Sequence, residues 1–183
     1  MRGFAYAEDK ASTEHMLEAY ATDNPEACVT VLRACTVLGP GSENDITRTY
    51  RRLSRVSVRG ADPEVQFLHE DDLEEALALC LRERIPGVYN VAGEGTVPYS
   101  EIARVGGRRS IALPAPLLAA LAQATWTLRL QSDSPAGGLA LVRWPWVASN
   151  ERLARETGFR PRHTSREVLM GSSLARGGGT RRE

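Results

Sequence analysis

The chain has 183 residues, of which 42% are hydrophobic and 25% are charged, so it is long enough to form one soluble globular domain. Its 23 Lys and Arg residues equal its 23 Asp and Glu residues, and this zero net charge gives no general attraction to nucleic acid or anionic lipid. No apolar run approaches the length of a membrane span, and the first residues lack the apolar core of a signal peptide. We therefore expect a cytoplasmic protein with no nucleic-acid and no membrane partner.

The hydrophobic pattern predicts alternating helices and strands in the first third of the chain. Apolar residues from Tyr6 to Tyr20 recur at helical spacing, and Asn24-Pro25 should end this helix. Residues 28–33, CVTVLR, are rich in β-branched residues, which is typical of a strand buried on both faces. The segments expected next are a turn at 39–42, an amphipathic helix at 44–55 and a short strand at 56–58.

The same alternation continues to residue 157. Residues 69–84 should form a helix, because acidic residues fill its first turn and arginines its last, as the helix dipole favours. Ser100 is the expected cap of a short helix after the loop at 93–98, and Ser149 is the expected cap of the last helix. The other expected elements are strands at 65–68, 87–92 and 110–113 and helices at 116–130 and 149–157. This order predicts an α/β fold with a largely parallel sheet.

Residues 1–170 are expected to form the folded domain. The tail from Gly171 to Glu183, GSSLARGGGTRRE, is expected to bury nothing useful and to be disordered.

Tyr6 and Lys10 form the main candidate for chemistry, because a spacing of four on a helix places two side chains on one face. A lysine ammonium beside a phenol favours the phenolate and lowers the tyrosine pKa from its usual value of about 10. Such a tyrosine can exchange a proton with a substrate hydroxyl while a nicotinamide exchanges hydride. Lys10 is the only lysine beside 22 arginines, which suggests a site where arginine will not serve. The alternative is an exposed tyrosine packing on a lysine stem.

Four motifs occur in order: YAEDKAS at 6–12, VLRACTVLGPGS at 31–42, VQFLHEDDLEEAL at 65–77 and GVYNVAGEGTVPYSEIA at 87–103. In this order and spacing they resemble the extended short-chain dehydrogenase/reductase family, the NAD-dependent epimerase/dehydratases, from about Tyr6 to Leu169. The resemblance implies a partial Rossmann-like NAD(P)-binding fold. It would comprise the second half of a doubly wound parallel sheet and a small C-terminal substrate-binding region.

The resemblance also implies roles for individual residues. Tyr6 would be the catalytic acid/base, and Lys10 would hold the nicotinamide ribose and tune Tyr6. Thr36 would contact a small-molecule substrate. The residues implied to contact the cofactor, NAD or NADP, are Lys10, Arg33, Ala34 and Cys35. The helix bearing Tyr6 commonly takes part in the family's dimer, so the resemblance is compatible with a homodimer.

His69 and Asp72 match the histidine and aspartate that precede a helix in the family. There we expect structural roles, with Asp72 capping the helix and His69 packing a loop. Nucleotide-sugar members usually carry an arginine where this chain has Glu64-Val65-Gln66, so a diphosphate-sugar substrate is not expected.

The family's glycine-rich loop, ribose-binding acid and upstream catalytic serine or threonine should all precede Tyr6, where this chain has five residues. We therefore expect a truncated, cofactor-impaired chain with an exposed sheet edge and poor solubility. Three hypotheses remain open. The first is an NAD(P)-dependent oxidoreductase or epimerase acting on a secondary alcohol or ketone of a small molecule. The second is a non-catalytic binding or regulatory protein derived from the same fold, and the third is a protein whose true start lies upstream.

Three further patterns have a structural and a functional interpretation. The cysteines lack metal-ligand spacing and are expected to be reduced, buried small residues. Arginines at helical spacing could hold an anion or touch nucleic acid, but a solvated basic face is expected. Trp144 and Trp146 could form a hydrophobic lid, but a core position is expected. The residues concerned in the first two patterns are Cys28, Cys35 and Cys80, and Arg48, Arg51, Arg52 and Arg55.

Overall fold

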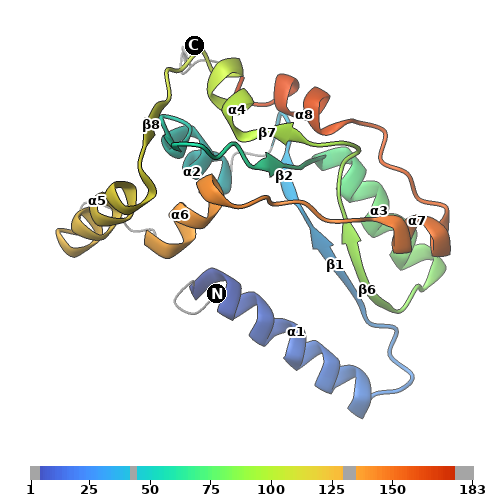
Figure 1. The fold of residues 1–183 in the computed structure, drawn as a ribbon. Helices are drawn as coiled ribbons and strands as arrows, with labels where there is room; N and C mark the ends of the chain where they lie inside the picture. The colour runs from blue at the N-terminus through green and yellow to red at the C-terminus, as the bar shows by residue number, and fades with distance from the viewer. Residues whose placement is uncertain (1–4, 42–44, 130–134, 176–183) are drawn as a thin grey trace, which may run out of the picture.

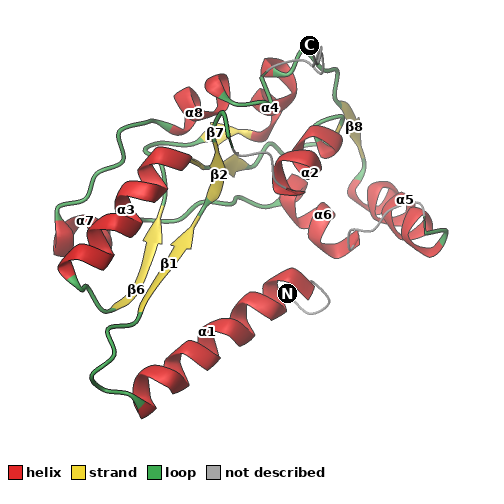
Figure 2. Cartoon of the chain, turned by 180° about the vertical axis from the view of Figure 1, so that it is seen from behind, coloured by secondary structure: helices red, strands yellow, loops and turns green. Residues whose placement is uncertain are grey.

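The structure, a computed structural model, describes residues 5–41, 45–129 and 135–175, without the side chains of residues 5–6, 45–46 and 135–138. In chain order the elements are α1 (Ala5–Asp23), β1 (Thr30–Ala34), β2 (Thr36–Leu38), α2 (Asp45–Leu53), β3 (Val56–Val58), β4 (Glu64–Val65), β5 (Phe67–His69), α3 (Glu70–Glu83), β6 (Gly87–Val91), β7 (Val97–Pro98), α4 (Tyr99–Val105), β8 (Ile111–Leu113), α5 (Ala115–Thr127), α6 (Pro135–Arg143), α7 (Glu151–Thr157) and α8 (Ser165–Gly171). The predicted α/β class, with parallel strand pairing, is confirmed (Figures 1 and 2).

The central strands form a parallel arrangement that changes neighbour at a single residue. Strand β1 pairs with β6, from Thr30 opposite Gly87 to Ala34 opposite Val91. Strand β2 then pairs with β5, and only Cys35 separates β1 from β2. Its backbone N–H donates to the carbonyl of Val91 at 2.9 Å. One continuous stretch of chain therefore has β6 as its neighbour before Cys35 and β5 after it. We call this place the strand switch.

Helices α3 and α7 cover the β1–β6 pair with a core of apolar side chains. Helix α3 forms where the sequence predicts it. Its C-cap is Arg84, which adopts a left-handed conformation with φ of 51°. Helix α7 packs on β6. The buried members of this core are Leu68, Ala76, Cys80, Tyr89, Val91, Leu153 and Phe159.

Helix α1 lies apart from this core in both ribbon views (Figures 1 and 2). One stripe of the helix, made of Ala7, Glu14, Leu17 and Ala21, is partly buried, while Met16 and Tyr20 are 72% and 53% exposed. The partly buried positions recur every three to four residues except at Lys10, which falls on the same stripe but is exposed. One face of α1 is thus directed at the rest of the chain.

The second core joins the short strands to the C-terminal helices. Strand β3 pairs in parallel with β8, and β4 pairs antiparallel with β7. Helices α2, α4 and α8 enclose these strands around Tyr50, Phe67 and Tyr99, each of which is at most 1% exposed. Helices α5 and α6 pack on one another at the edge of this unit (Figure 1). No helix within the described ranges has the length and apolar character that a bilayer crossing needs.

Several local predictions are wrong, and each has a physical reason. The strand expected at 65–68 is divided at Gln66, because β4 pairs with β7 before this residue and β5 pairs with β2 after it. Ser100 does not cap α4: Pro98 is the N-cap, and the Ser100 N–H and hydroxyl both donate to Asp62. Asn150, rather than Ser149, occupies the N-cap of α7, although the Ser149 hydroxyl accepts from the Glu151 N–H at 3.3 Å.

The C-terminal part of the chain packs further than expected. Helix α8 begins with a capping box, in which Thr164 and Glu167 satisfy each other's backbone N–H groups. Beyond it Leu174 is completely buried, so the expectation that the chain from Gly171 onward buries nothing is wrong for this residue. Residues 176–183 of the expected tail lie outside the described residues.

The cysteines and tryptophans divide between core and surface. All three cysteines are free, and Cys80 is buried as expected, whereas Cys28 is exposed. Trp146 packs partly buried against the second core and donates its indole N–H to the Ala140 carbonyl at 3.3 Å. Trp144 is 54% exposed with the Arg143 guanidinium 5.0 Å from its ring centre, so the expected core position holds for only one of the two.

Candidate active site at the strand switch

Four of the predicted site residues follow one another at the carboxyl end of β1. Arg33 and Ala34 end β1, Cys35 is the switch residue, and Thr36 begins β2. Ligands of parallel α/β sheets bind at the carboxyl ends of strands, at points where the strand order changes. The strand switch lies at the carboxyl end of β1, so it is the first place to look for a ligand site.

Arg33 is engaged by helix α1. Its Nε lies 2.9 and 3.0 Å from the two carboxylate oxygens of Glu14, and its Nη2 also contacts Glu14. This hydrogen-bonded pairing lowers the pKa of Glu14 and raises that of Arg33. The guanidinium, predicted to contact a cofactor, here ties the strand to the helix.

The predicted catalytic pair lies on α1. The helix runs unbroken from Ala5 to Asp23, so Tyr6, Lys10 and Glu14 follow one another at a spacing of four and lie along one side of it. Because Glu14 contacts Arg33, this side of α1 is the one turned toward β1. The Lys10 side chain is exposed, and the Tyr6 side chain lies outside the described residues. The helix geometry that the sequence predicts is confirmed, while the contact between the two side chains stays a prediction.

Cys35 has the properties of a space-filling thiol. Burial raises the pKa of its thiol to about 11, although a hydrogen bond with the backbone of Gly93 acts in the opposite direction. The thiol is therefore protonated at neutral pH, and it is a poor nucleophile. The contact with a cofactor that the sequence predicts for Cys35 would therefore be a packing contact of its thiol.

Thr36 makes a hydrogen bond with Tyr50 of α2, a residue that the sequence analysis did not single out. Tyr50 is 1% exposed, and burial raises the pKa of its phenol to about 12. Its ring packs edge-on against Phe67, with ring centres 5.8 Å apart. The hydroxyl of Thr36 is thus held from the core side. The only sequence signal for Tyr50 was its place on the apolar side of an amphipathic helix.

A buried amide fixes the backbone next to the switch. The Gln66 Nε2 donates to the Gly93 carbonyl at 2.8 Å, and its Oε1 accepts from the Ala148 N–H at 2.9 Å. Asn150 reinforces the same connection by donating to the Ala92 carbonyl at 3.0 Å. Gly93 is required here, because a Cβ would lie 2.1 Å from the Phe67 carbonyl oxygen. The signal for Gln66 was a polar residue inside an apolar run.

The strand after Gln66 ends in a histidine–aspartate cluster whose roles differ from those expected. His69, not Asp72, caps α3, and its Nδ1 accepts from the Asp71 N–H at 3.2 Å. Asp72 is completely buried and accepts the N–H groups of Arg162 and His163 at 3.0 and 3.2 Å. The rings of His69 and His163 stack 4.2 Å apart. Asp72 therefore latches the segment before α8 onto α3, which is a structural role.

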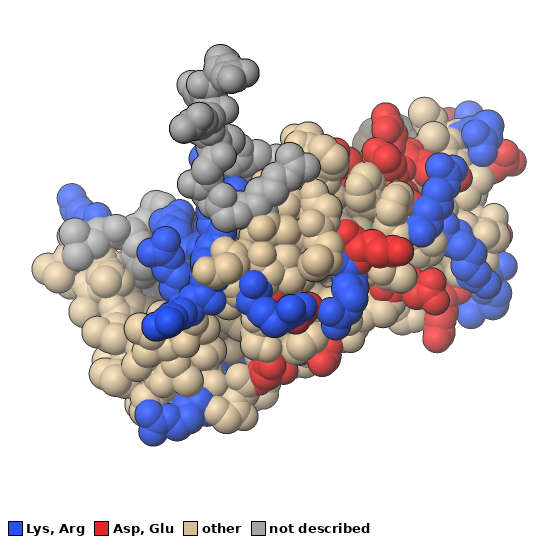
Figure 3. Space-filling view, turned by 90° about the horizontal axis from the view of Figure 1, so that it is seen from above, with Lys and Arg blue, Asp and Glu red and all other residues tan. Residues whose placement is uncertain are grey.

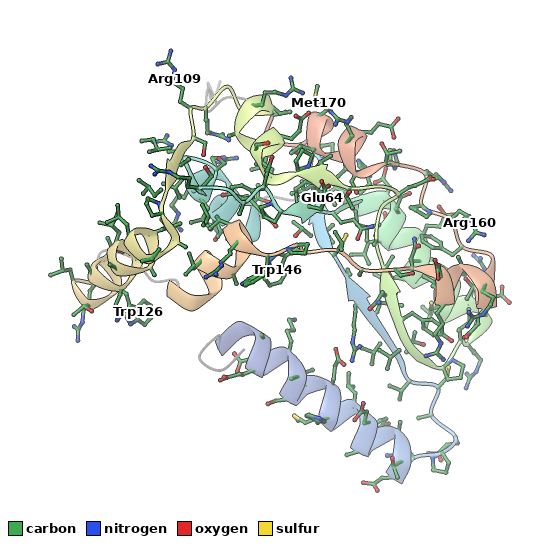
Figure 4. The ribbon with its side chains drawn as sticks, in the orientation of Figure 1. Glu64, Arg109, Trp126, Trp146, Arg160 and Met170 are labelled. Carbon is green, nitrogen blue, oxygen red and sulfur yellow. The ribbon has the colours of Figure 1, made fainter. Side chains whose placement is uncertain are left out.

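Figure 4 places three labelled side chains around this unit: Trp146 lies in the segment between α6 and α7, Glu64 lies in β4, and Arg109 extends outward ahead of β8. The backbone N–H of Trp146 donates to the Glu64 carbonyl at 2.9 Å, so the segment after α6 is bound to the strands beside the switch. No group of three metal-ligating side chains occurs in the described part of the chain.

The residues at the switch fit one half of a nicotinamide dinucleotide better than the other. Lys10 lies on the side of α1 turned toward β1, and its ammonium is a hydrogen-bond donor that suits the hydroxyl oxygens of a ribose. A pyrophosphate instead needs uncompensated N–H groups at a helix N-terminus. Helix α3, which follows β5 directly, begins with Glu70, Asp71 and Asp72, and three carboxylates disfavour a phosphate.

Comparison with known proteins gives three findings. The model of the NAD dependent epimerase/dehydratase family matches residues 2–92. An uncharacterized protein of Mycobacterium tuberculosis is 25% identical over 169 residues, which are 90% of this chain and 43% of that relative. The chain thus spans less than half the length of the curated relative that it matches.

Solved structures share the fold. The dTDP-glucose 4,6-dehydratase from Bacillus anthracis in complex with NAD superposes with a TM-score of 0.62 at 15% identity, over 93% of this chain and 51% of that one. The UDP-glucose 4-epimerase of Thermus thermophilus in complex with NAD gives 0.60 at 20% identity, over 95% and 54%. At these identities the likeness concerns the fold, and this chain corresponds to about half of a Rossmann-type structure.

Proposed function

Because the model of the NAD dependent epimerase/dehydratase family matches residues 2–92, we propose that the chain carries the proton-transfer side of a nicotinamide-dependent oxidoreductase or epimerase site. The substrate is a small molecule with a secondary alcohol or ketone. The observation that carries the proposal is the anchoring of α1 on β1 by Glu14 and Arg33. In this proposal the side of α1 that bears Tyr6 and Lys10, at a spacing of four from Glu14, serves the strand switch.

The chemistry follows from these residues. A bound nicotinamide would exchange hydride with the substrate carbon. Tyr6 exchanges the proton of the substrate hydroxyl, since a phenol near an ammonium has a pKa closer to neutral. Lys10 supplies that ammonium and donates to the ribose. Thr36, held by Tyr50, is the proposed substrate contact, and the thiol of Cys35 excludes water beside the nicotinamide.

In this proposal the chain recognises the nicotinamide and ribose but not the distal phosphate and adenosine. A dinucleotide and a mononucleotide should then bind alike. We expect the purified chain to bind NADH and reduced nicotinamide mononucleotide with affinities within about threefold of one another, measured by nicotinamide fluorescence. A Lys10→Met variant should bind both more weakly by about tenfold, because a charge-assisted donor is lost.

Two results would contradict the proposal. Equal affinity of the Lys10→Met variant and the unchanged chain would remove Lys10 from the site. Tighter binding of NADH than of the mononucleotide by about 30-fold or more would assign recognition of the distal half to this chain. An Arg82→Met variant, changed on the far helix α3, is the matched control and should bind like the unchanged chain.

A second candidate function is a non-catalytic binding or regulatory protein. It is favoured by the engagement of two predicted ligand-contacting side chains, Arg33 with Glu14 and Thr36 with Tyr50. Under this alternative neither NADH nor the mononucleotide binds at millimolar concentration, and Tyr6→Phe changes no measurable property of the chain other than stability.

We also propose a homodimer formed through the outward side of α1. Met16 and Tyr20 lie four residues apart on the side opposite Glu14 and are exposed. Apolar side chains at this spacing form the stripe through which two helices can pack.

A further inference from the structure

Three arginines from separate segments of the chain lie near one another, and none of them belongs to the strand switch. Arg51 lies near the end of α2, Arg55 precedes β3, and Arg108 precedes β8. Pairing of β3 with β8 brings them together, since the Ile111 N–H donates to the Arg55 carbonyl at 2.9 Å. Tyr50, one residue before Arg51, occupies the core side of α2. We call Arg51, Arg55 and Arg108 the arginine cluster.

The turn after α8 holds two members of the arginine cluster. The Arg51 Nη2 donates to the Ser173 hydroxyl at 3.3 Å, and the Arg108 Nη1 donates to the Leu174 carbonyl at 3.5 Å. The turn is itself fixed, because Leu174 is completely buried and its N–H donates to the Ser172 hydroxyl at 3.2 Å. Two guanidinium groups are therefore ordered before any ligand arrives, which lowers the entropic cost of binding.

Within the arginine cluster, like charges act on Arg108. Burial lowers the pKa of Arg108, and the like charges of Arg51 and Arg55 lower it further. An arginine keeps its proton at neutral pH, so the three positive charges coexist at short range. Among the ion pairs of the described residues, no carboxylate pairs with Arg55 or Arg108, whereas Arg104 and Arg166 nearby share Glu101.

Figure 3 shows the consequence on the surface. Lys and Arg side chains gather on the left part of that face, where no Asp or Glu side chain is visible, while both signs alternate on the right. The zero net charge of the whole chain thus conceals a region of one sign. Guanidinium groups bind the oxygens of a phosphoryl group through paired N–H donors.

We propose that Arg51, Arg55 and Arg108 bind the phosphoryl group of an anionic small molecule. Arg108 and Arg51, held by the 172–175 turn, form the fixed part of the site. Arg55, which is exposed, completes it from the surface. A phosphoryl dianion suits the site better than a carboxylate, because it carries more charge and presents oxygens to all three guanidinium groups at once. The site uses none of the residues assigned to the nicotinamide, so its test does not depend on the outcome for the proposed function.

The test is isothermal titration calorimetry on the full chain at constant ionic strength set with sodium chloride. The ligands are inorganic phosphate, pyrophosphate and glycerol 3-phosphate, which separate a free anion from a phosphate ester. We expect saturable binding with one site per chain for at least one of the three. Arg108→Ala should weaken this binding by about tenfold or more, and Arg108→Lys by less, because charge is kept while the fork is lost.

Arg109→Ala is the matched control, since Arg109 is the adjacent arginine and extends away from the body of the molecule (Figure 4). It should bind like the unchanged chain. Circular dichroism verifies folding of each variant, and if Arg108→Ala does not fold, Arg55→Ala followed by ³¹P chemical shifts replaces it. The proposal is overturned if the unchanged chain shows no saturable binding, or if the cluster variants and Arg109→Ala lose affinity equally.

Discussion

The guanidinium of Arg33 donates to both carboxylate oxygens of Glu14 and thereby joins strand β1 to helix α1. The two residues are 19 positions apart, and the pairing decides which side of α1 is turned toward the strand switch. Since Glu14 follows Lys10 by four residues, the same pairing orients the proposed catalytic side of the helix. An electrostatic contact, rather than a large apolar interface, sets this orientation.

Arg33→Ala should loosen α1 while leaving the rest of the fold intact. The pair is partly exposed, with the Arg33 side chain 54% exposed, so the free energy of unfolding should fall by less than about 1 kcal/mol. Hydrogen exchange measured by mass spectrometry should nevertheless rise in α1 specifically. Arg82→Ala, which removes an exposed pair with the neighbouring Glu83, is the control and should leave α1 unchanged. Equal exchange of α1 in both variants would contradict the anchoring role.

Glu101→Gln should remove an acid-sensitive part of the stability. Glu101 is 7% exposed and accepts from Arg104 and Arg166, each at 2.7 Å. The hydrogen bond and charge of Arg104, and then the charge of Arg166, hold its pKa below the usual carboxyl range. A carboxyl whose pKa is lower in the folded state stabilises fully above its unfolded pKa, and this stabilisation is lost as the pH falls through the folded pKa.

The prediction for Glu101 is therefore a difference that depends on pH. Urea unfolding at pH 7 should show Glu101→Gln to be less stable than the unchanged chain, and the difference should shrink as the pH falls below about 4. Glu74→Gln, at an exposed position on α3, should show no such difference at any pH. A constant difference across the whole range would rule out the charge of Glu101 as the cause.

Tyr50→Phe should lose the hydrogen bond to Thr36 and keep the ring contact with Phe67. We expect a loss of about 0.5–1.5 kcal/mol in the free energy of unfolding. In a double-mutant cycle with Thr36→Val the two losses should not add, because both remove the same bond. Tyr20→Phe, on the exposed side of α1, should be neutral. Strict additivity in the cycle would show that the two hydroxyls do not depend on one another.

Gly93→Ala should be among the more damaging single substitutions in the chain. The added Cβ would lie 2.1 Å from the Phe67 carbonyl oxygen, and both are backbone positions that cannot rotate away. A loss of more than about 2 kcal/mol is expected, since overpacking displaces the backbone itself. Gly171→Ala, where a Cβ meets nothing within 4 Å, should change the stability by less than about 0.5 kcal/mol. Similar melting temperatures for the two variants would contradict this prediction.

The double substitution Met16→Glu with Tyr20→Glu tests the proposed homodimer. If α1 packs against a second α1, charges on its outward side should shift the chain to a monomer in light scattering at micromolar concentration. Thr13→Glu with Ala19→Glu, two other exposed positions of the same helix, is the charge-matched control. A monomeric unchanged chain would disprove the dimer directly.

Elements with a strong local signal could be predicted from the sequence, and contacts between distant segments could not. Helix α3 was predictable from its terminal charges, and β1 from its β-branched residues, because those signals act within a few residues. The two helices that were not predicted, α6 and α8, differ in kind. The Thr164–Glu167 capping box was a readable signal for α8, whereas the first turn of α6 holds a pair of glycines, which argue against a helix.

At the candidate site the sequence indicated the positions of residues along the chain but not their hydrogen-bond partners. The order of Arg33 to Thr36 after the strand followed from the motif. Their actual partners, Glu14 and Tyr50, lie on separate helices, and no periodicity encodes such pairs. The same limit explains Asp72. Three carboxylates open α3, and only the packing of the 162–163 segment decides which of them turns inward.

The strand switch at Cys35 has one further consequence. Side chains of an extended chain point alternately up and down, so the number of residues between two pairings fixes their phase. With one residue between β1 and β2, the phase carries through from Arg33 to Val37 without interruption. Adding or deleting a single residue here would turn Thr36 and Leu38 to the opposite face, which would remove the buried side chain of Leu38 from the core. The residue types at the strand switch can change, but the number of residues between β1 and β2 cannot.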